Sequence, residues 1–230
     1  MSTLLAFDTA TAATVVGVLR SGGELVTRRD DPPAGARPRH AGRLLRLCDE
    51  ALAAAGARWS DVARIGVGVG PGTFTGLRIG VATARALGQA TGAELVAVGT
   101  LSALALAARG AGHPGAALAV LDARRGEAFA AGWSGSGEAL SPPAALDPAR
   151  LAELADPGVG PWLAIGDGAV RFRASLEPAL TVPDDDSPLH GVDAGALCRL
   201  AAEGPPVARE ELVPDYLRLP DAELERRARS

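Results

Sequence analysis

The chain has 230 residues and a formal net charge of −4, and 47% of its residues are hydrophobic. This length fits one large domain or two small lobes, and no apolar run reaches the ~18 residues that a membrane-spanning helix needs. The sequence contains no lysine. This excludes a Walker A phosphate loop and Schiff-base catalysis, because both require a lysine amine.

The sequence predicts a cytoplasmic protein. Met1-Ser2-Thr3 leads directly into an apolar run without a basic segment, so no signal peptide is expected. Cys48 and Cys198 are too few for a disulfide framework. Residues 1–110 hold 12 arginines against 8 acidic residues (+4), and residues 111–230 hold 11 against 19 (−8). Any contact with RNA should therefore favour the first half, although ordinary surface charge explains the difference equally well.

The first 30 residues predict three strands. Apolar or alternating runs cover Thr3–Thr9, Ala13–Arg20 and Glu24–Arg29. Ser21-Gly22-Gly23 is a tight-turn signal between the last two. These two strands should form a hairpin, so the sheet should be at least partly antiparallel.

A long helix is predicted from Arg39 to Ala55, ended by Gly56. It has a core-facing stripe and, beside it, a second apolar row. The stripe is Ala41, Leu44, Leu45, Cys48, Leu52 and Ala55, and the second row is Leu47, Ala51 and Ala54. A helix that is apolar on more than one side should be covered on more than one side.

Strands and helices then alternate. A strand at Ile65–Val69 is followed by a helix at Phe74–Thr91, a strand at Glu94–Val98 and a helix at Thr100–Arg109. This alternation predicts parallel strand pairing.

A second unit follows, with strands at Ala116–Leu121, Glu127–Trp133 and Trp162–Ile165 and a capped helix at Asp193–Glu203. The sequence thus predicts an α/β protein with two lobes, residues 1–108 and 109–230, each a mixed sheet flanked by helices.

Most catalytic and metal-binding patterns are missing. The histidines are His40, His113 and His190, without HxxxH or HExxH spacing, and no GxSxG sequence occurs. We expect no metal and no cofactor of the chain's own.

Asp8-Thr9 ends the first strand, where actin-like ATPases carry an Asp-x-Gly phosphate turn. Ala10 follows here, and its Cβ hinders the approach of backbone amides to a phosphate. We therefore expect at most weak nucleotide binding at Asp8 and Thr9. The alternative is that the carboxylate caps the turn.

The run from Gly70 to Gly76 is the densest signal in the chain. Pro71 between Gly70 and Gly72 permits a sharp strand-to-helix turn, and Thr73 can cap the helix that begins at Phe74. Such a turn can hold an anion at the helix N-terminus or can be a tight connection without a ligand. We prefer the second interpretation.

The helix after this turn has a ridge of small residues, Gly76, Gly80, Ala84 and Gly88. Each interior glycine costs roughly 1 kcal/mol of helix stability relative to alanine, so close packing must compensate. The partner is either the Arg39–Ala55 helix or another molecule. We hypothesise that the two helices form a docking face for a protein partner. The residues assigned to it are His40, Leu44, Leu47, Ala51, Gly76, Gly80 and Ala84.

Several segments together resemble the signature of the TsaB (YeaZ) family. The longest is Val67 to Gly80, which contains Gly70, Pro71, Gly72, Thr73 and Phe74. The others are Leu5 to Thr11, Asp122 to Glu127 with Arg124, Gly166-Asp167-Gly168 and Tyr216-Leu217-Arg218. They occur in the family's order and spacing across essentially the whole chain.

This resemblance implies an actin-like (ASKHA, ribonuclease H-like) fold of two related lobes. It also implies a non-catalytic subunit of the bacterial complex that forms N6-threonylcarbamoyladenosine at position 37 of ANN-reading tRNAs. The implied partners are the catalytic paralogue TsaD and the ATPase TsaE, with a homodimer when the chain is alone and tRNA contacted at most through the complex.

Three alternatives stay open from the sequence. ATP or ADP can bind at the partner interface. The chain can instead be an ATP-dependent kinase or acyltransferase of the same fold, against which Ala10 and the missing lysine argue. A metallopeptidase is opposed by the missing ligand spacing.

Overall fold

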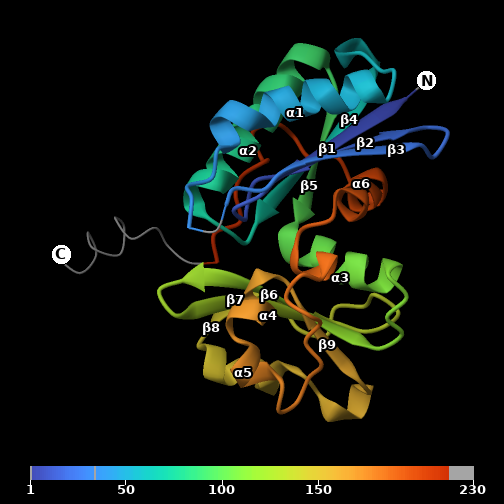
Figure 1. The fold of residues 1–230 in the computed structure, drawn as a ribbon. Coiled ribbons are helices and arrows are strands. Elements are labelled where there is room, and N and C mark those ends of the chain that lie inside the picture. Colours follow the sequence, from blue (N-terminus) through green and yellow to red (C-terminus); the bar gives the residue numbers. More distant parts are fainter. Residues whose placement is uncertain (1, 34, 218–230) are drawn as a thin grey trace.

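A computed structural model describes residues 2–33 and 35–217. The strands are β1 (Thr3–Asp8), β2 (Thr14–Arg20), β3 (Leu25–Asp30), β4 (Val62–Gly70), β5 (Glu94–Gly99), β6 (Ala116–Arg124), β7 (Glu127–Trp133), β8 (Ala144–Leu146) and β9 (Trp162–Ile165). The α-helices are α1 (His40–Ala54), α2 (Phe74–Thr91), α3 (Thr100–Gly110), α4 (Asp167–Arg171), α5 (Arg173–Leu176) and α6 (Ala194–Glu203). Short 3₁₀ helices cover Trp59–Asp61, Pro148–Leu154, Pro157–Val159 and Pro188–His190. Two sheets lie one above the other, with α3 and α6 between them (Figure 1).

The two sheets share one topology. The first has the order β3-β2-β1-β4-β5, and the second has the order β8-β7-β6-β9. In each, three consecutive antiparallel strands are followed by a parallel one, β4 beside β1 and β9 beside β6. The second sheet thus repeats the first without a counterpart of β5. Two related lobes with mixed sheets are confirmed.

Helices cover both faces of the first sheet (Figure 1). On one face, α1 and α2 bury leucines and alanines against Leu5, Phe7 and Ile65. On the other face, α6 packs so closely that a Cβ at Gly17 would lie 2.7 Å from the Sγ atom of Cys198. Glycine in β2 therefore lets the helix approach the strand backbone.

The helix α6 departs from the expected division of the chain. It belongs to the range 109–230 by sequence, yet it packs against β1, β2 and β4 of the first sheet. Its Leu197 and Ala201 lie in one apolar cluster with Ala6 and Val96. The boundary at residue 108 stays a prediction, and the C-terminal segment returns to the first lobe.

Local signals placed most element ends correctly. Gly56 adopts a φ of +62° directly after the C-cap of α1. The backbone N–H of Ala196 donates to Asp193 Oδ1 at 2.7 Å, which caps α6 as expected. The short strand β8 lies in a segment for which the sequence predicted no strand, and Arg218 of the signature lies outside the described residues.

Candidate functional site

The end of β1 and the turn before α2 are locked together. The backbone N–H of Thr73 donates to the carbonyl of Ala10 at 2.7 Å, and the hydroxyl of Thr9 donates to the carbonyl of Gly76 at 2.8 Å. A Cβ at Gly72 would lie 2.5 Å from that of Ala10. The glycine-rich turn is therefore a packed connection, as the preferred interpretation of the sequence has it.

Thr73 does not act as expected. It occupies the N-cap position of α2, but its side chain makes no capping hydrogen bond. The prediction that its hydroxyl caps the helix is wrong. The backbone N–H of this residue is instead used to hold the turn against β1.

Asp8 is fully buried beneath this turn. Its Oδ1 accepts from the backbone N–H of Ala10 at 2.7 Å, and its Oδ2 accepts from the hydroxyl of Thr100 at 2.8 Å. Burial raises the pKa of this carboxyl, and the two hydrogen bonds oppose the shift. Thr9 is also fully buried. Neither side chain is exposed to solvent, and the carboxylate braces the turn. The assignment of both residues to weak nucleotide binding stays a prediction.

The burial of Asp8 predicts a pH-dependent effect of Asp8→Asn. The raised pKa makes the folded state hold this proton above the unfolded-chain value of about 4. Wild-type stability is therefore lost as the pH rises from that value through the folded pKa. The neutral amide has no such loss, so the variant should gain stability relative to wild type as the pH rises. Urea unfolding from about pH 4 to about pH 8 measures the difference.

Asp61→Asn is the control of opposite sign for this experiment. The backbone hydrogen bond from Arg58 lowers the pKa of the exposed Asp61 carboxyl, so its stabilising contribution is present at high pH and lost as the pH falls. A stability difference between Asp8→Asn and wild type that stays constant over the whole range would contradict the placement of Asp8.

The small-residue ridge of α2 faces its own lobe. A Cβ at Gly80 would lie 2.6 Å from the hydroxyl of Thr9, and one at Gly88 would lie 2.8 Å from Leu95. A Cβ at Gly76 would collide with the carbonyl oxygen of Thr9. The glycines are thus compensated by packing against β1 and β5.

The residues predicted to contact a partner are all buried by this chain. These are His40, Leu44, Leu47 and Ala51 of α1 and Gly76, Gly80 and Ala84 of α2. Leu47 and Ala51 of the second apolar row of α1 are not spare surface, because the first sheet covers them together with Leu44, Cys48 and Leu52. Ala54 of this row is exposed. Leu44, Leu47, Ala51, Gly80 and Ala84 are covered by the lobe itself, whereas His40 and Gly76 line a hollow between the two helices. Direct partner contact through the seven residues stays a prediction. The docking role of the two helices stays a prediction that their exposed side chains must carry.

The exposed side of the helix pair has its own apolar features. Leu45, which was predicted to face the core, is 51% exposed on α1. One turn before it, Ala41 lines a hollow of about 790 Å³ that also contacts Thr75 and Ile79 of α2. Leu45 and the partly buried Ile79 thus add large apolar side chains to the outer surface of the two helices.

The second lobe contributes a polar turn to the same region. Asp122 at the end of β6 accepts from the backbone N–H of Arg124 at 2.8 Å and pairs with the Arg171 guanidinium at 3.6 Å. Its backbone N–H donates to Asp167 Oδ1 at 3.1 Å. Burial raises the pKa of Asp167. Arg124 reaches the hollow between α1 and α2, so the signature turns of both lobes meet at one edge of the molecule.

Among the residues that the structure describes, no group of three or more His, Cys, Asp or Glu side chains could hold a metal ion. In the same part of the chain, no helix combines the length and the apolar character needed to cross a bilayer.

Comparison with known proteins shows which family this chain belongs to. Residues 32–175 match the family model described as TsaD: tRNA N6-adenosine threonylcarbamoyltransferase. The chain is 32% identical over 230 residues to the tRNA threonylcarbamoyladenosine biosynthesis protein TsaB of Escherichia coli, which covers 94% of both chains. The chain belongs to the TsaB (YeaZ) family. An uncharacterized protein of Mycobacterium tuberculosis is 36% identical over 222 residues, covering 96% of this chain and 94% of that protein.

Solved structures agree with TsaB membership. YeaZ from Pseudomonas aeruginosa matches with a TM-score of 0.80 and 30% identity, covering 94% of this chain and 100% of that one. A ROK hexokinase from Thermus thermophilus matches with a TM-score of 0.50 at 16% identity, covering 87% of this chain and 100% of that one, and thus shares the fold alone. The expected actin-like fold is confirmed, and TsaB membership shows a role in threonylcarbamoyladenosine biosynthesis.

The TsaB signature segments have structural roles that the sequence showed only in part. The rings of Phe74 and Tyr216 pack together with their centroids 5.1 Å apart, and the Arg78 guanidinium lies 3.8 Å from the centroid of the Phe74 ring. The contact with Tyr216 ties the C-terminal segment to α2. Glu127, also in the signature, opens β7 and has an interaction partner within the chain. The sequence missed the arginines before and within α1, for which the excess of arginine in the first half was the one available signal.

Proposed function

We propose that the chain is a non-catalytic subunit that binds and supports a TsaD-like paralogue in the cytoplasm. The complex forms N6-threonylcarbamoyladenosine at position 37 of ANN-reading tRNAs. Membership of the TsaB family supports the pathway. The non-catalytic role is supported above all by the burial of Asp8. This acid at the phosphate turn is fully buried, and both of its oxygens accept hydrogen bonds from within the chain.

The outer surface of α1 and α2 is the proposed docking face. It has an exposed leucine at position 45 and a partly buried isoleucine at position 79, and it borders the hollow at the N-terminal ends of both helices. The proposed occupant is the TsaD-like paralogue, because the match to the TsaD family model spans α1 and α2 and a chain with that fold offers an equivalent helix pair. A second copy of this chain would use the same face when the paralogue is absent.

The proposal also includes a second protein partner and a nucleotide. A TsaE-like ATPase joins the assembly once the paralogue is bound, and ATP or ADP is held at the interface rather than at Asp8 alone. The second candidate function, an independent ATP-dependent kinase or acyltransferase, is disfavoured by the buried state of Asp8.

Co-purification with the paralogue tests the proposal. The tagged full chain should retain the TsaD-like paralogue of the same genome in equal amounts. The isolated chain should neither hydrolyse ATP nor modify tRNA. Steady ATP hydrolysis by the isolated chain that is abolished in Asp8→Ala would instead support the alternative function, an ATP-dependent kinase or acyltransferase. Failure to retain the paralogue would contradict the subunit role.

A further inference from the structure

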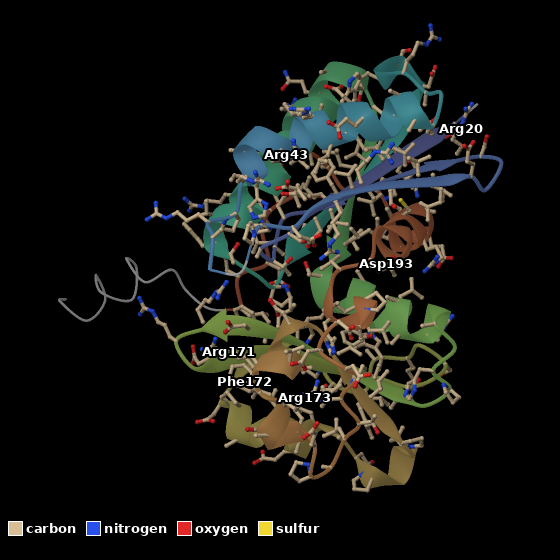
Figure 2. All side chains as sticks on the ribbon, viewed as in Figure 1. Arg20, Arg43, Arg171, Phe172, Arg173 and Asp193 are labelled. Atoms are coloured by element: carbon tan, nitrogen blue, oxygen red, sulfur yellow. The ribbon has the colours of Figure 1, made fainter. Side chains whose placement is uncertain are left out.

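Arginines from both lobes gather around the hollow at the N-terminal ends of α1 and α2. Arg37, Arg39 and Arg43 line it from the first lobe, and Arg124 lines it from the β6–β7 hairpin of the second. Arg171 lies beside this hairpin because it shares Asp122 with Arg124. Figure 2 shows Arg43 on the upper lobe and Arg171 on the lower lobe.

The acidic partners of these arginines are buried, whereas Arg39, Arg124 and Arg171 are exposed and Arg43 is partly exposed. Asp30 Oδ1 accepts from Arg39 at 2.7 Å and from Arg43 at 3.1 Å, and its side chain is 8% exposed against 59% for Arg39. Asp122 pairs with Arg124 at 3.3 Å, with side chains 7% and 62% exposed. Each carboxylate is therefore shared by two guanidinium groups. Counted among these six groups alone, four arginines against two acids leave a charge of +2, and Arg37 adds one further positive charge.

The two helices that open into the hollow have N-termini without side-chain caps. Neither Arg39 at the start of α1 nor Thr73 at the start of α2 makes a capping hydrogen bond with its side chain. Asp193 caps α6 in the ordinary way. The first-turn N–H groups of a helix favour an anion, so the backbone adds to the attraction of the guanidinium groups.

Arg124 is held in this place at a conformational cost. Its φ is +64°, and that of Arg125 is +54°. Left-handed backbone is unfavourable for a residue with a side chain, and such positions cluster at binding sites. A glycine at position 124 would avoid this cost, and it would keep the backbone N–H that donates to Asp122. The arginine side chain at this position pairs with the buried Asp122 and also reaches the hollow, which a glycine could not do.

We propose that these arginines form a surface that binds the phosphodiester backbone of RNA directly. Guanidinium groups suit phosphate because their parallel N–H donors match two phosphate oxygens. A surface that spans two lobes suits a polymer with repeated phosphates better than a single small anion. This inference rests on the proposed function for the identity of the RNA, which is the tRNA that the complex modifies.

The salt dependence of RNA binding tests the inference. The probe is a fluorescently labelled transcript of an ANN-reading tRNA, titrated with the full chain and with its complex with the TsaD-like paralogue. Arg37→Ala and Arg124→Gly should each weaken binding several-fold and lower the slope of log K against log salt by about 1. Arg150→Ala is the matched control, because Arg150 is also 62% exposed and pairs with one acid. It should leave both quantities unchanged.

Several results would overturn the inference. The first is that Arg37→Ala and Arg124→Gly bind RNA with the affinity and salt slope of wild type; the absence of RNA binding by the wild-type chain and by its complex would also overturn it. The second is that these variants lose the paralogue in a pull-down but bind RNA unchanged, because the surface would then contact protein. The third is full displacement of the RNA by inorganic phosphate at matched ionic strength, because the site would then hold a free phosphoryl group. Retention of the paralogue is measured separately, so failure of the RNA contact is distinguished from failure of the subunit role.

Discussion

Gly76→Ala is expected to lower the free energy of unfolding by about 3 kcal/mol, at the upper end of the range for overpacking a buried site. The added Cβ would collide with the carbonyl oxygen of Thr9, which is main chain and cannot rotate away. The same shift would disturb the hydrogen bond from the Thr9 hydroxyl to the Gly76 carbonyl. Gly80→Leu should be destabilising for a related reason, since its Cβ would lie 2.6 Å from that hydroxyl.

Gly42→Ala is the matched control for Gly76→Ala. Gly42 is the third residue of α1 as Gly76 is the third residue of α2. A Cβ at Gly42 would meet no atom within 4 Å, so this variant should be more stable than wild type by roughly 0.5–1 kcal/mol. Urea unfolding of both variants measures the contrast. Equal stability of Gly76→Ala and wild type would show that β1 and α2 are not in the contact described.

Leu45→Glu is expected to weaken binding of the TsaD-like paralogue by about 2 kcal/mol or more, the size of a hot-spot loss. Leu45 is 51% exposed and lies one turn after Ala41, which lines the hollow beside Ile79. The introduced carboxylate stays in water in the free chain but would be desolvated beneath a docked helix. The variant should therefore fold normally and bind poorly.

Leu140→Glu is the control for this experiment, because Leu140 is 41% exposed in the second lobe away from α1 and α2. Thermal unfolding checks that both variants fold, and isothermal titration with the paralogue measures the affinities. Leu47→Glu is not a useful probe, since Leu47 is 2% exposed and a charge there should unfold the lobe. Full-strength binding by folded Leu45→Glu would place the docking face elsewhere.

The apolar rows of α1 predicted a helix covered on more than one side, which is wrong, because the buried residues form one stripe against the first sheet while Ala41, Leu45 and Ala54 are exposed. The glycines of α2 predicted correctly that a backbone approaches closely. Neither pattern identifies the covering group. In the structure it is the first sheet for Leu47 and Ala51, and Thr9 at the end of β1 for Gly76 and Gly80. A periodic pattern records that a face is buried, but many different neighbours can bury it equally well.

By itself, the sequence determined the features that depend on neighbouring residues. The period of apolar residues placed the strands and helices, Asp193 marked the start of α6, and Gly56 marked the end of α1. The order and spacing of the signature segments indicated the family and the repeated lobe. These signals are local because backbone propensity, capping and turn geometry act over a few residues.

Only the tertiary structure decided the features that join distant segments. It returned α6 to the first sheet, buried both oxygens of Asp8 between Ala10 and Thr100, and brought Arg124 to the hollow lined by Arg39 and Arg43. Hydrophobic burial is not directional, so apolar residues do not encode which surface they meet. The sharing of one buried carboxylate by two arginines arises only when the packed elements set their distances, as Asp30 and Asp122 do at the edge where the two lobes meet.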